Sequence, residues 1–198
     1  MIVGPDYVFI STRKAGTCSL YELLQEHFGG RRVGSFHAHT SSEIGDKSIF
    51  TTCRDPFSRM VSMWWYLTHR GDRSRFFDEM GFQEFCVLCS KRPRKEWLES
   101  QCDRHAKFNP SHVVHLEFLV PEFNKLPFVD KEVTFPRRNE AKDGCSWEGG
   151  IWDDKDPRLP PIERMGVPWE TFYSDRTEAE IRNAYADDIE RYYPWLTT

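Results

Sequence analysis

The segment YVFISTRKAGTCSL, residues 7–20, decides how this chain folds. Its first four residues are an apolar run of the kind that forms a buried strand, and its end starts a helical pattern. Between them lies a loop in which Lys14 precedes a single glycine, Gly16, and the hydroxyl residues Thr17 and Ser19. Backbone N–H groups at a helix start, together with the helix dipole, attract phosphate. The sequence therefore predicts a strand, an anion-binding loop and a helix, in that order.

A second segment with the same organisation is SIFTTCRDPFSRMVS, residues 48–62. An apolar strand is expected over 49–53, and Pro56 suits the first turn of a helix, where the N–H that proline lacks would have no partner. Arg54 follows the strand and Ser62 lies within the helix. A planar guanidinium and a hydroxyl are groups that favour phosphate binding. Two anion sites after neighbouring strands suit a nucleotide with phosphate at both ends of its ribose.

The rest of the chain continues the alternation of strands and helices. Strands are expected at 7–10, 32–36, 49–53 and 113–118, and helices at 17–28, 56–69, 83–91 and 177–193. A capping-box pattern begins the last helix, with Thr177 as N-cap, and residues 143–161 predict a long loop. This order is typical of an α/β fold in which helices flank a central parallel sheet, here in a single domain over residues 1–198. Such sheets bind ligands at the carboxyl ends of their strands.

These motifs resemble those of a known enzyme family. Residues 13–20 resemble the 5′-phosphosulfate loop of the sulfotransferases that use 3′-phosphoadenosine 5′-phosphosulfate (PAPS), and residues 54–62 resemble their 3′-phosphate motif. The segment FHAHT, residues 36–40, is similar to the His-x-His segment of the heparan and uronyl 2-O-sulfotransferase branch. Residues 169–190 look like the last helix of the superfamily, while residues 70–169 match it only loosely. The resemblance implies the P-loop-like sulfotransferase fold.

The resemblance also implies which residues bind the cofactor. PAPS would be the sulfuryl donor and PAP the product, with no metal in the site. The residues expected to bind the cofactor are Arg13, Lys14, Ala15, Gly16, Thr17, Cys18, Ser19, Arg54, Ser62 and Arg138. Arg138 is included because FPRRN, residues 135–139, matches a late cofactor loop of the family, although a solvated arginine pair explains this segment equally well.

Catalysis needs one group for the leaving oxygen and one for the acceptor. Lys14 is expected to stabilise the charge that develops on the bridging oxygen. The acceptor hydroxyl must lose a proton, and a histidine titrates in the range that suits this role. The resemblance assigns the base to His39, with His37 as the fallback. If neither serves, the remaining candidates are Glu117, His105 and His112.

Composition limits the partners and the location. The net charge is −4 and the isoelectric point is near 6.0, which argues against general nucleic-acid binding. No apolar run approaches the roughly 18–20 residues of a membrane helix. The sequence predicts a cytoplasmic enzyme whose acceptor is a hydroxyl-bearing glycan or other small molecule. A Golgi-lumen location remains open if the chain is the trimmed part of an anchored protein.

The chain has six cysteines, and their spacing allows a metal site. Cys86, Cys89, Cys102 and His105 form a C-x2-C-x12-C-x2-H pattern that could hold zinc. The stronger interpretation is that Cys86 and Cys89 lie on the buried side of an amphipathic helix as free thiols. A disulfide in this region is a further alternative. Cys18, in the anion loop, is expected to contribute its backbone N–H.

Two other functional classes fit parts of the sequence. A nucleotide kinase would need the G-x-x-x-x-G-K-[ST] loop, but here Lys14 precedes the only glycine of the loop. A non-catalytic nucleotide- or glycan-binding module would not need the histidines at 37 and 39. Turnover separates the module from an enzyme, and removal of Mg²⁺ with EDTA separates the kinase from a sulfotransferase.

Overall fold

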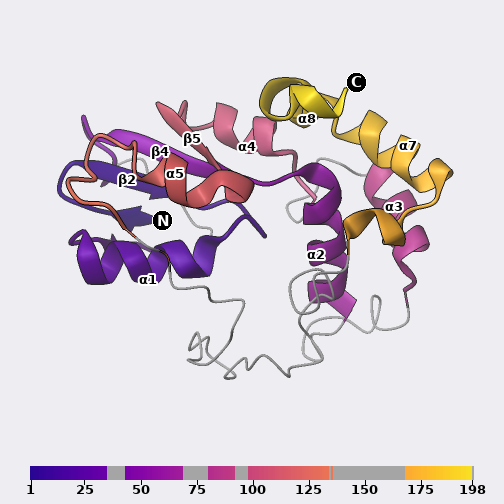
Figure 1. Ribbon diagram of the computed structural model, residues 1–198, viewed down its shortest axis with the longest axis horizontal. Coiled ribbons are helices and arrows are strands. Elements are labelled where there is room, and N and C mark those ends of the chain that lie inside the picture. The colour runs from indigo at the N-terminus through magenta and orange to yellow at the C-terminus, as the bar shows by residue number, and fades with distance from the viewer. Residues whose placement is uncertain (35–42, 69–79, 92–97, 134, 136–167, 198) are drawn as a thin grey trace. The chain divides into compact units, whose positions relative to one another are not determined.

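The structure is a computed structural model that describes residues 1–34, 43–68, 80–91, 98–133, 135 and 168–197 (Figure 1). Its contacts divide the chain into two compact units. The first unit is Met1–Arg54 with Gln101–Pro136, and the second is Asp55–Ser100 with Arg137–Thr198. Each unit has its own hydrophobic core. The predicted α/β class is therefore confirmed in its coarse form, with a five-stranded sheet in the first unit.

The sheet of the first unit is mixed, with the strand order β3-β1-β2-β4-β5. Its strands are β1 (Ile2–Val3), β2 (Tyr7–Ile10), β3 (Arg31–Arg32), β4 (Ser48–Cys53) and β5 (His112–His115). The strands β2, β4 and β5 are parallel, as predicted, whereas β1 runs antiparallel to both β2 and β3. The sequence prediction missed β1, because two residues are too few to show an alternating pattern.

The register brings the carboxyl ends of the three parallel strands together. Ile10 of β2 pairs with Thr51 of β4, and Cys53 at the end of β4 pairs with His115 at the end of β5. The segments that follow β2 and β4 are the two predicted anion-binding segments. They therefore begin at the same edge of the sheet, which is where ligands of parallel sheets bind.

Two layers of apolar side chains hold the sheet. On one face, α1 (Thr17–His27) and α5 (Leu119–Phe123) pack against an aromatic core. Within this core Phe9 stacks on Phe50 at 4.9 Å and Tyr7 stacks on Phe128 at 4.1 Å between ring centroids. On the other face a smaller cluster includes Val8 and Ile10, and Phe108, which follows α4 (Gln101–Ala106) in the chain, packs against it. Helices thus flank the sheet.

The predicted strand over 113–118 ends early. The backbone leaves the sheet after His115 and forms the 3₁₀ helix η2 (Leu116–Phe118). At this point the N–H of His115 donates to Glu122 Oε2 at 2.6 Å, in α5. The carboxylate thus provides a side-chain acceptor at the end of this edge strand. The predicted strand over 32–36 is confirmed only as the two-residue β3, and residues 35–36 lie outside the described part.

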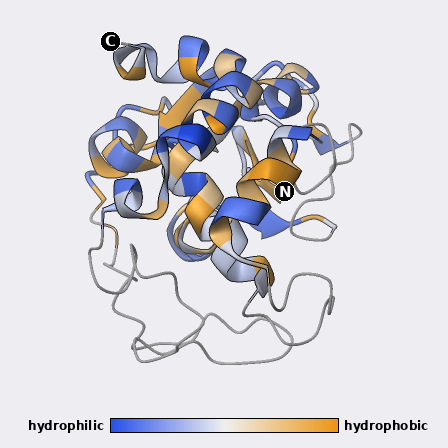
Figure 2. Ribbon diagram, turned by 90° about the vertical axis from the view of Figure 1, so that its right-hand side faces the viewer, coloured by the Kyte–Doolittle hydropathy of each residue, from blue (hydrophilic) through white to orange (hydrophobic). Residues whose placement is uncertain are grey.

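The second unit is helical in its described residues. Its elements are α2 (Pro56–Thr68), α3 (Phe82–Lys91), η3 (Trp169–Phe172), α7 (Asp175–Ala184), α8 (Ala186–Tyr192) and η4 (Pro194–Leu196). Their buried faces include Phe57, Met60, Phe85 and Ile181. Figure 2 shows that the helices carry both hydrophobic and hydrophilic residues, as amphipathic helices do. In the described residues, no helix is both long and apolar enough to cross a membrane.

The predicted final helix, 177–193, is divided in two. The division falls at Tyr185, whose φ of −118° and ψ of 29° are not helical. Tyr185 is buried and its hydroxyl donates to the Leu98 carbonyl at 2.8 Å, so tertiary packing has overridden the helical periodicity. The capping box also lies one turn earlier than predicted: Ser174 is the N-cap and Thr177 is its N3 partner.

Candidate functional site

The loop after β2 has an unusual backbone at two positions. Lys14 has φ of 61° and Gly16 has φ of 77°. Gly16 is the N-cap of α1 and provides no side-chain cap. Because the first N–H groups of an α-helix have no intrahelical acceptor, a helix that begins on glycine presents these donors to a ligand. The backbone of the loop is therefore compatible with the predicted anion site, which stays a prediction.

Hydrogen bonds from inside the unit hold this loop in shape. Thr52 Oγ1, on β4, donates to the Ala15 carbonyl at 2.7 Å, and Thr17 Oγ1 donates to the Thr12 carbonyl at 2.9 Å. Ala15 is fully buried. The Thr17 hydroxyl thus points into the protein, and Ala15 and Thr17 would meet a phosphate through backbone atoms rather than side chains. Cys18, next along α1, is exposed.

Arg54 joins the second motif to this loop. Its Nη1 donates to the Lys14 carbonyl at 3.3 Å, and the residue is only 8% exposed. Its backbone is held by Gln101, whose Oε1 accepts from Arg54 N and whose Nε2 donates to Arg54 O, both at 2.8 Å. A guanidinium fixed in this way has the geometry and charge that suit phosphate binding.

A polar cluster beneath the loop was not foreseen from the sequence. His105 Nε2, on α4, lies 3.0 Å from Thr12 Oγ1 and 3.2 Å from Thr51 Oγ1, and His105 is 1% exposed. Thr51 Oγ1 also donates to the Ile10 carbonyl at 2.7 Å. These contacts connect the ends of β2 and β4 to α4. The residues are far apart in the chain, and no short-range pattern pairs them.

The 3₁₀ helix η2, which follows β5, lies next to the loop that follows β2. A Cβ atom placed on Gly16 would lie 2.7 Å from Leu116 Cδ1, closer than real carbon contacts allow. Glycine is therefore favoured at this position mainly by the positive φ, while the Leu116 side chain would have to shift to admit a Cβ atom. The residue before Leu116 is His115, whose Nδ1 lies 3.0 Å from Glu122 Oε2. Sequence reasoning also missed this pair, because its members are seven residues apart across a strand end.

The remaining predicted site residues are placed as follows. Arg13, Lys14 and Ser19 are half-buried in the first unit, and Ser62 is fully buried in α2 of the second. His37, His39 and Arg138 lie outside the described residues. The structure therefore brings together the loop and Arg54, and the other site residues remain predictions.

The described cysteines are free thiols. These are Cys18, Cys53, Cys86, Cys89 and Cys102. Burial raises the pKa of Cys86 to about 12 and raises that of Cys89 further, as expected for thiols within a core. No cluster of three or more His, Cys, Asp or Glu side chains suited to a metal occurs in the described ranges.

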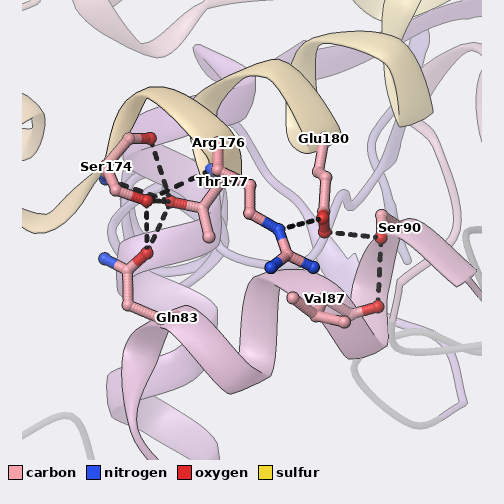
Figure 3. Close-up of polar contacts among 7 residues, drawn as sticks. All are labelled: Gln83, Val87, Ser90, Ser174, Arg176, Thr177 and Glu180. Atoms are coloured by element: carbon pink, nitrogen blue, oxygen red, sulfur yellow. Dashed lines mark hydrogen bonds and ion pairs between the residues drawn. The ribbon is translucent and has the colours of Figure 1, made fainter.

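A shallow depression of about 580 Å³ lies in the second unit between α3 and α7. Its polar lining is already engaged (Figure 3): Gln83 Oε1 accepts from Ser174 Oγ at 2.8 Å and from Thr177 Oγ1 at 2.7 Å. Along the same helices, Glu180 accepts from Arg176 Nε at 3.1 Å and from Ser90 Oγ at 3.2 Å. These bonds tie α7 to α3 and give the depression a structural explanation.

The anion loop and Arg54 are thus the best-supported candidate site. Together they offer helix N–H donors, a lysine and a buried guanidinium at the carboxyl edge of parallel strands. Comparison with known proteins finds no match to any family model, curated protein or solved structure.

Proposed function

We propose that this protein is a sulfotransferase that moves the sulfuryl group of PAPS to an acceptor hydroxyl. One observation carries the proposal: Arg54 Nη1 donates to the Lys14 carbonyl at 3.3 Å. This contact joins the two segments that resemble the 5′-phosphosulfate and 3′-phosphate motifs. A nucleotide with phosphate at both ends of its ribose would use both segments at once.

The proposed roles follow from the chemistry of each group. The first N–H groups of α1 and the Lys14 ammonium bind the 5′-phosphosulfate, because a helix N-terminus and a cation both favour negative charge. The Arg54 guanidinium binds the 3′-phosphate. Ser62 and Arg138 are proposed as additional ligands of the 3′-phosphate on the strength of the resemblance.

Sulfuryl transfer then proceeds by in-line displacement. The acceptor oxygen attacks sulfur, and the bond between sulfur and the bridging oxygen breaks, leaving its electron pair on the 5′-phosphate of PAP. Lys14 stabilises the charge that builds on that oxygen, as donors do in phosphoryl transfer. The resemblance names His39, or His37, as the base that takes the hydroxyl proton. The acceptor is proposed to be a glycan or another small hydroxyl compound.

A transfer assay with sulfur-labelled PAPS tests the proposal directly. The acceptor panel comprises polysaccharides, glycolipids, phenols and tyrosyl peptides, each assayed with and without EDTA. We expect EDTA-resistant label transfer to one class, and its loss in the Lys14→Ala variant. In a parallel assay with γ-phosphate-labelled ATP, label transfer that needs Mg²⁺ would instead identify a kinase. PAP binding without any turnover would identify a binding module.

A further inference from the structure

A histidine that the sequence analysis did not consider lies at the same edge of the sheet as Lys14 and Arg54. His115 is the last residue of β5, and its backbone pairs with Cys53, the residue before Arg54. The next residue, Leu116, lies against Gly16 of the anion loop. His115 therefore ends the edge strand β5 beside the strand that leads to Arg54, and its chain neighbour Leu116 approaches the loop that follows β2.

A carboxylate holds the His115 ring in place. Its Nδ1 lies 3.0 Å from Glu122 Oε2 and 3.2 Å from Oε1, and the same carboxylate accepts from the His115 backbone N–H at 2.6 Å. The side chains are 20% and 29% exposed, so the pair is accessible but partly shielded from water. When Nδ1 carries the proton and donates to Glu122, the lone pair of the neutral ring is on Nε2. This is how a carboxylate orients a catalytic histidine.

We propose that His115 is the general base of the reaction and that Glu122 is its positioning residue; this inference rests on the proposed sulfotransferase function. His115 Nε2 takes the proton of the acceptor hydroxyl while the acceptor oxygen forms its bond to sulfur. The bridging bond breaks and its electron pair remains on the 5′-phosphate of PAP. The imidazolium then releases its proton to solvent, which restores the base. This assignment replaces the one that the resemblance gives to His39 or His37.

The other two histidines of the same region do not fit this role. His105 is buried, and its Nε2 lies within hydrogen-bonding distance of the Thr12 and Thr51 hydroxyls. His112 is the first residue of β5 and pairs with Phe50, so it lies at the opposite end of the strand from the anion loop. His115 combines a carboxylate partner with a place at the carboxyl edge of the sheet.

Four variants of the full chain test the assignment, with His112→Ala as the matched control on the same strand. In His115→Gln and His115→Ala we expect kcat to fall by about 10²–10⁴-fold, the usual contribution of a general base. Glu122→Gln keeps an acceptor for the backbone N–H but loses the charge, so kcat should fall with KM unchanged. PAP affinity, measured by calorimetry, should stay near wild type in all of these variants. Added imidazole should restore part of the activity of His115→Ala, which it would not do for a merely structural residue.

Three results would overturn the inference. The first is a kcat within threefold of wild type in His115→Gln with unchanged melting temperature. The second is a loss in His39→Ala that exceeds the loss in His115→Ala. The third is a wild-type protein that transfers no sulfuryl group to any acceptor, which overturns the proposed function and removes this assignment with it. Normal wild-type transfer with an active His115→Gln variant overturns the assignment of His115 alone.

Discussion

At the scale of single residues, Arg54 connects the two halves of the candidate site. Its side chain reaches the Lys14 carbonyl while its backbone is bonded to Gln101, so neither its position nor its direction depends on a ligand. Pre-organised charged groups lose little entropy on binding and therefore contribute more affinity. We expect Arg54 to contribute mainly to cofactor binding and Lys14 mainly to catalysis.

Replacing Arg54 by alanine should weaken PAP binding by about 1.5–3 kcal/mol, the value of a charge-assisted hydrogen bond. The loss for adenosine 5′-phosphosulfate, which has no 3′-phosphate, should be much smaller. Calorimetry with both ligands measures the difference, and Arg31→Ala, at an exposed position of β3, is the control. Equal losses for the two ligands would show that Arg54 does not bind the 3′-phosphate.

Replacing Lys14 by alanine should lower kcat by about 10²–10³-fold while PAP affinity changes far less. The reason is that the charge on the bridging oxygen develops only in the transition state. Alanine and lysine both have a Cβ, so the cost of the positive φ at this position is the same in the variant and the wild type. A variant with normal kcat and a raised KM would contradict the catalytic role.

At the scale of elements, the anion loop depends on the contact between Gly16 and η2. Ala at position 16 would combine a φ of 77° with a Cβ only 2.7 Å from Leu116 Cδ1. We expect Gly16→Ala to destabilise the protein by about 1–3 kcal/mol and to weaken PAP binding. Urea unfolding measures the first effect. In Gly16→Ala/Leu116→Ala the steric part should be relieved, and strictly additive effects would show that the two residues do not interact.

The elements also show which features could be predicted from sequence. Four elements were predicted to within one residue at each end: β2, α1, β4 and α2. In these segments the apolar periodicity and the turn residues indicate the same structure. The short elements β1, α4 and α5 were missed, since two to six residues carry too little pattern. The loop and Arg54 were found through their motifs. His115 with Glu122 was not, because their contact depends on where β5 ends.

At the scale of the whole molecule, the described cysteines of the two units differ in exposure, and their thiols should therefore differ in reactivity. Cys18 is exposed at the start of α1 in the first unit, while Cys86 and Cys89 are buried in the core of the second. Burial raises the pKa of Cys86 to about 12, so at neutral pH almost none of it is the reactive thiolate.

In the native protein, an alkylating reagent should therefore modify Cys18 before Cys86 and Cys89. PAP should slow the modification of Cys18, because the 5′-phosphate occupies the same helix start. Peptide mapping by mass spectrometry identifies the labelled sites, and Cys18→Ser is the control for background labelling. Rapid modification of Cys86 in the folded protein would contradict its burial in the core. A Cys18 modification rate that PAP does not change would contradict PAP binding at the start of α1.

The paired hydrogen bonds between Arg54 and Gln101 also bear on how such a protein could diversify. The chain leaves the first unit after Arg54 and returns at Gln101, and the Gln101 amide bonds both the N–H and the C=O of Arg54 as a neighbouring strand would. Arg54 and Gln101, the residues at which the chain leaves and re-enters the first unit, are thus held together by two hydrogen bonds. Because the entropy of closing a loop grows slowly with its length, insertions between α2 and Gln101 that leave α3 intact should be tolerated. The excursion could lengthen or change in sequence over generations while the anion loop keeps its geometry.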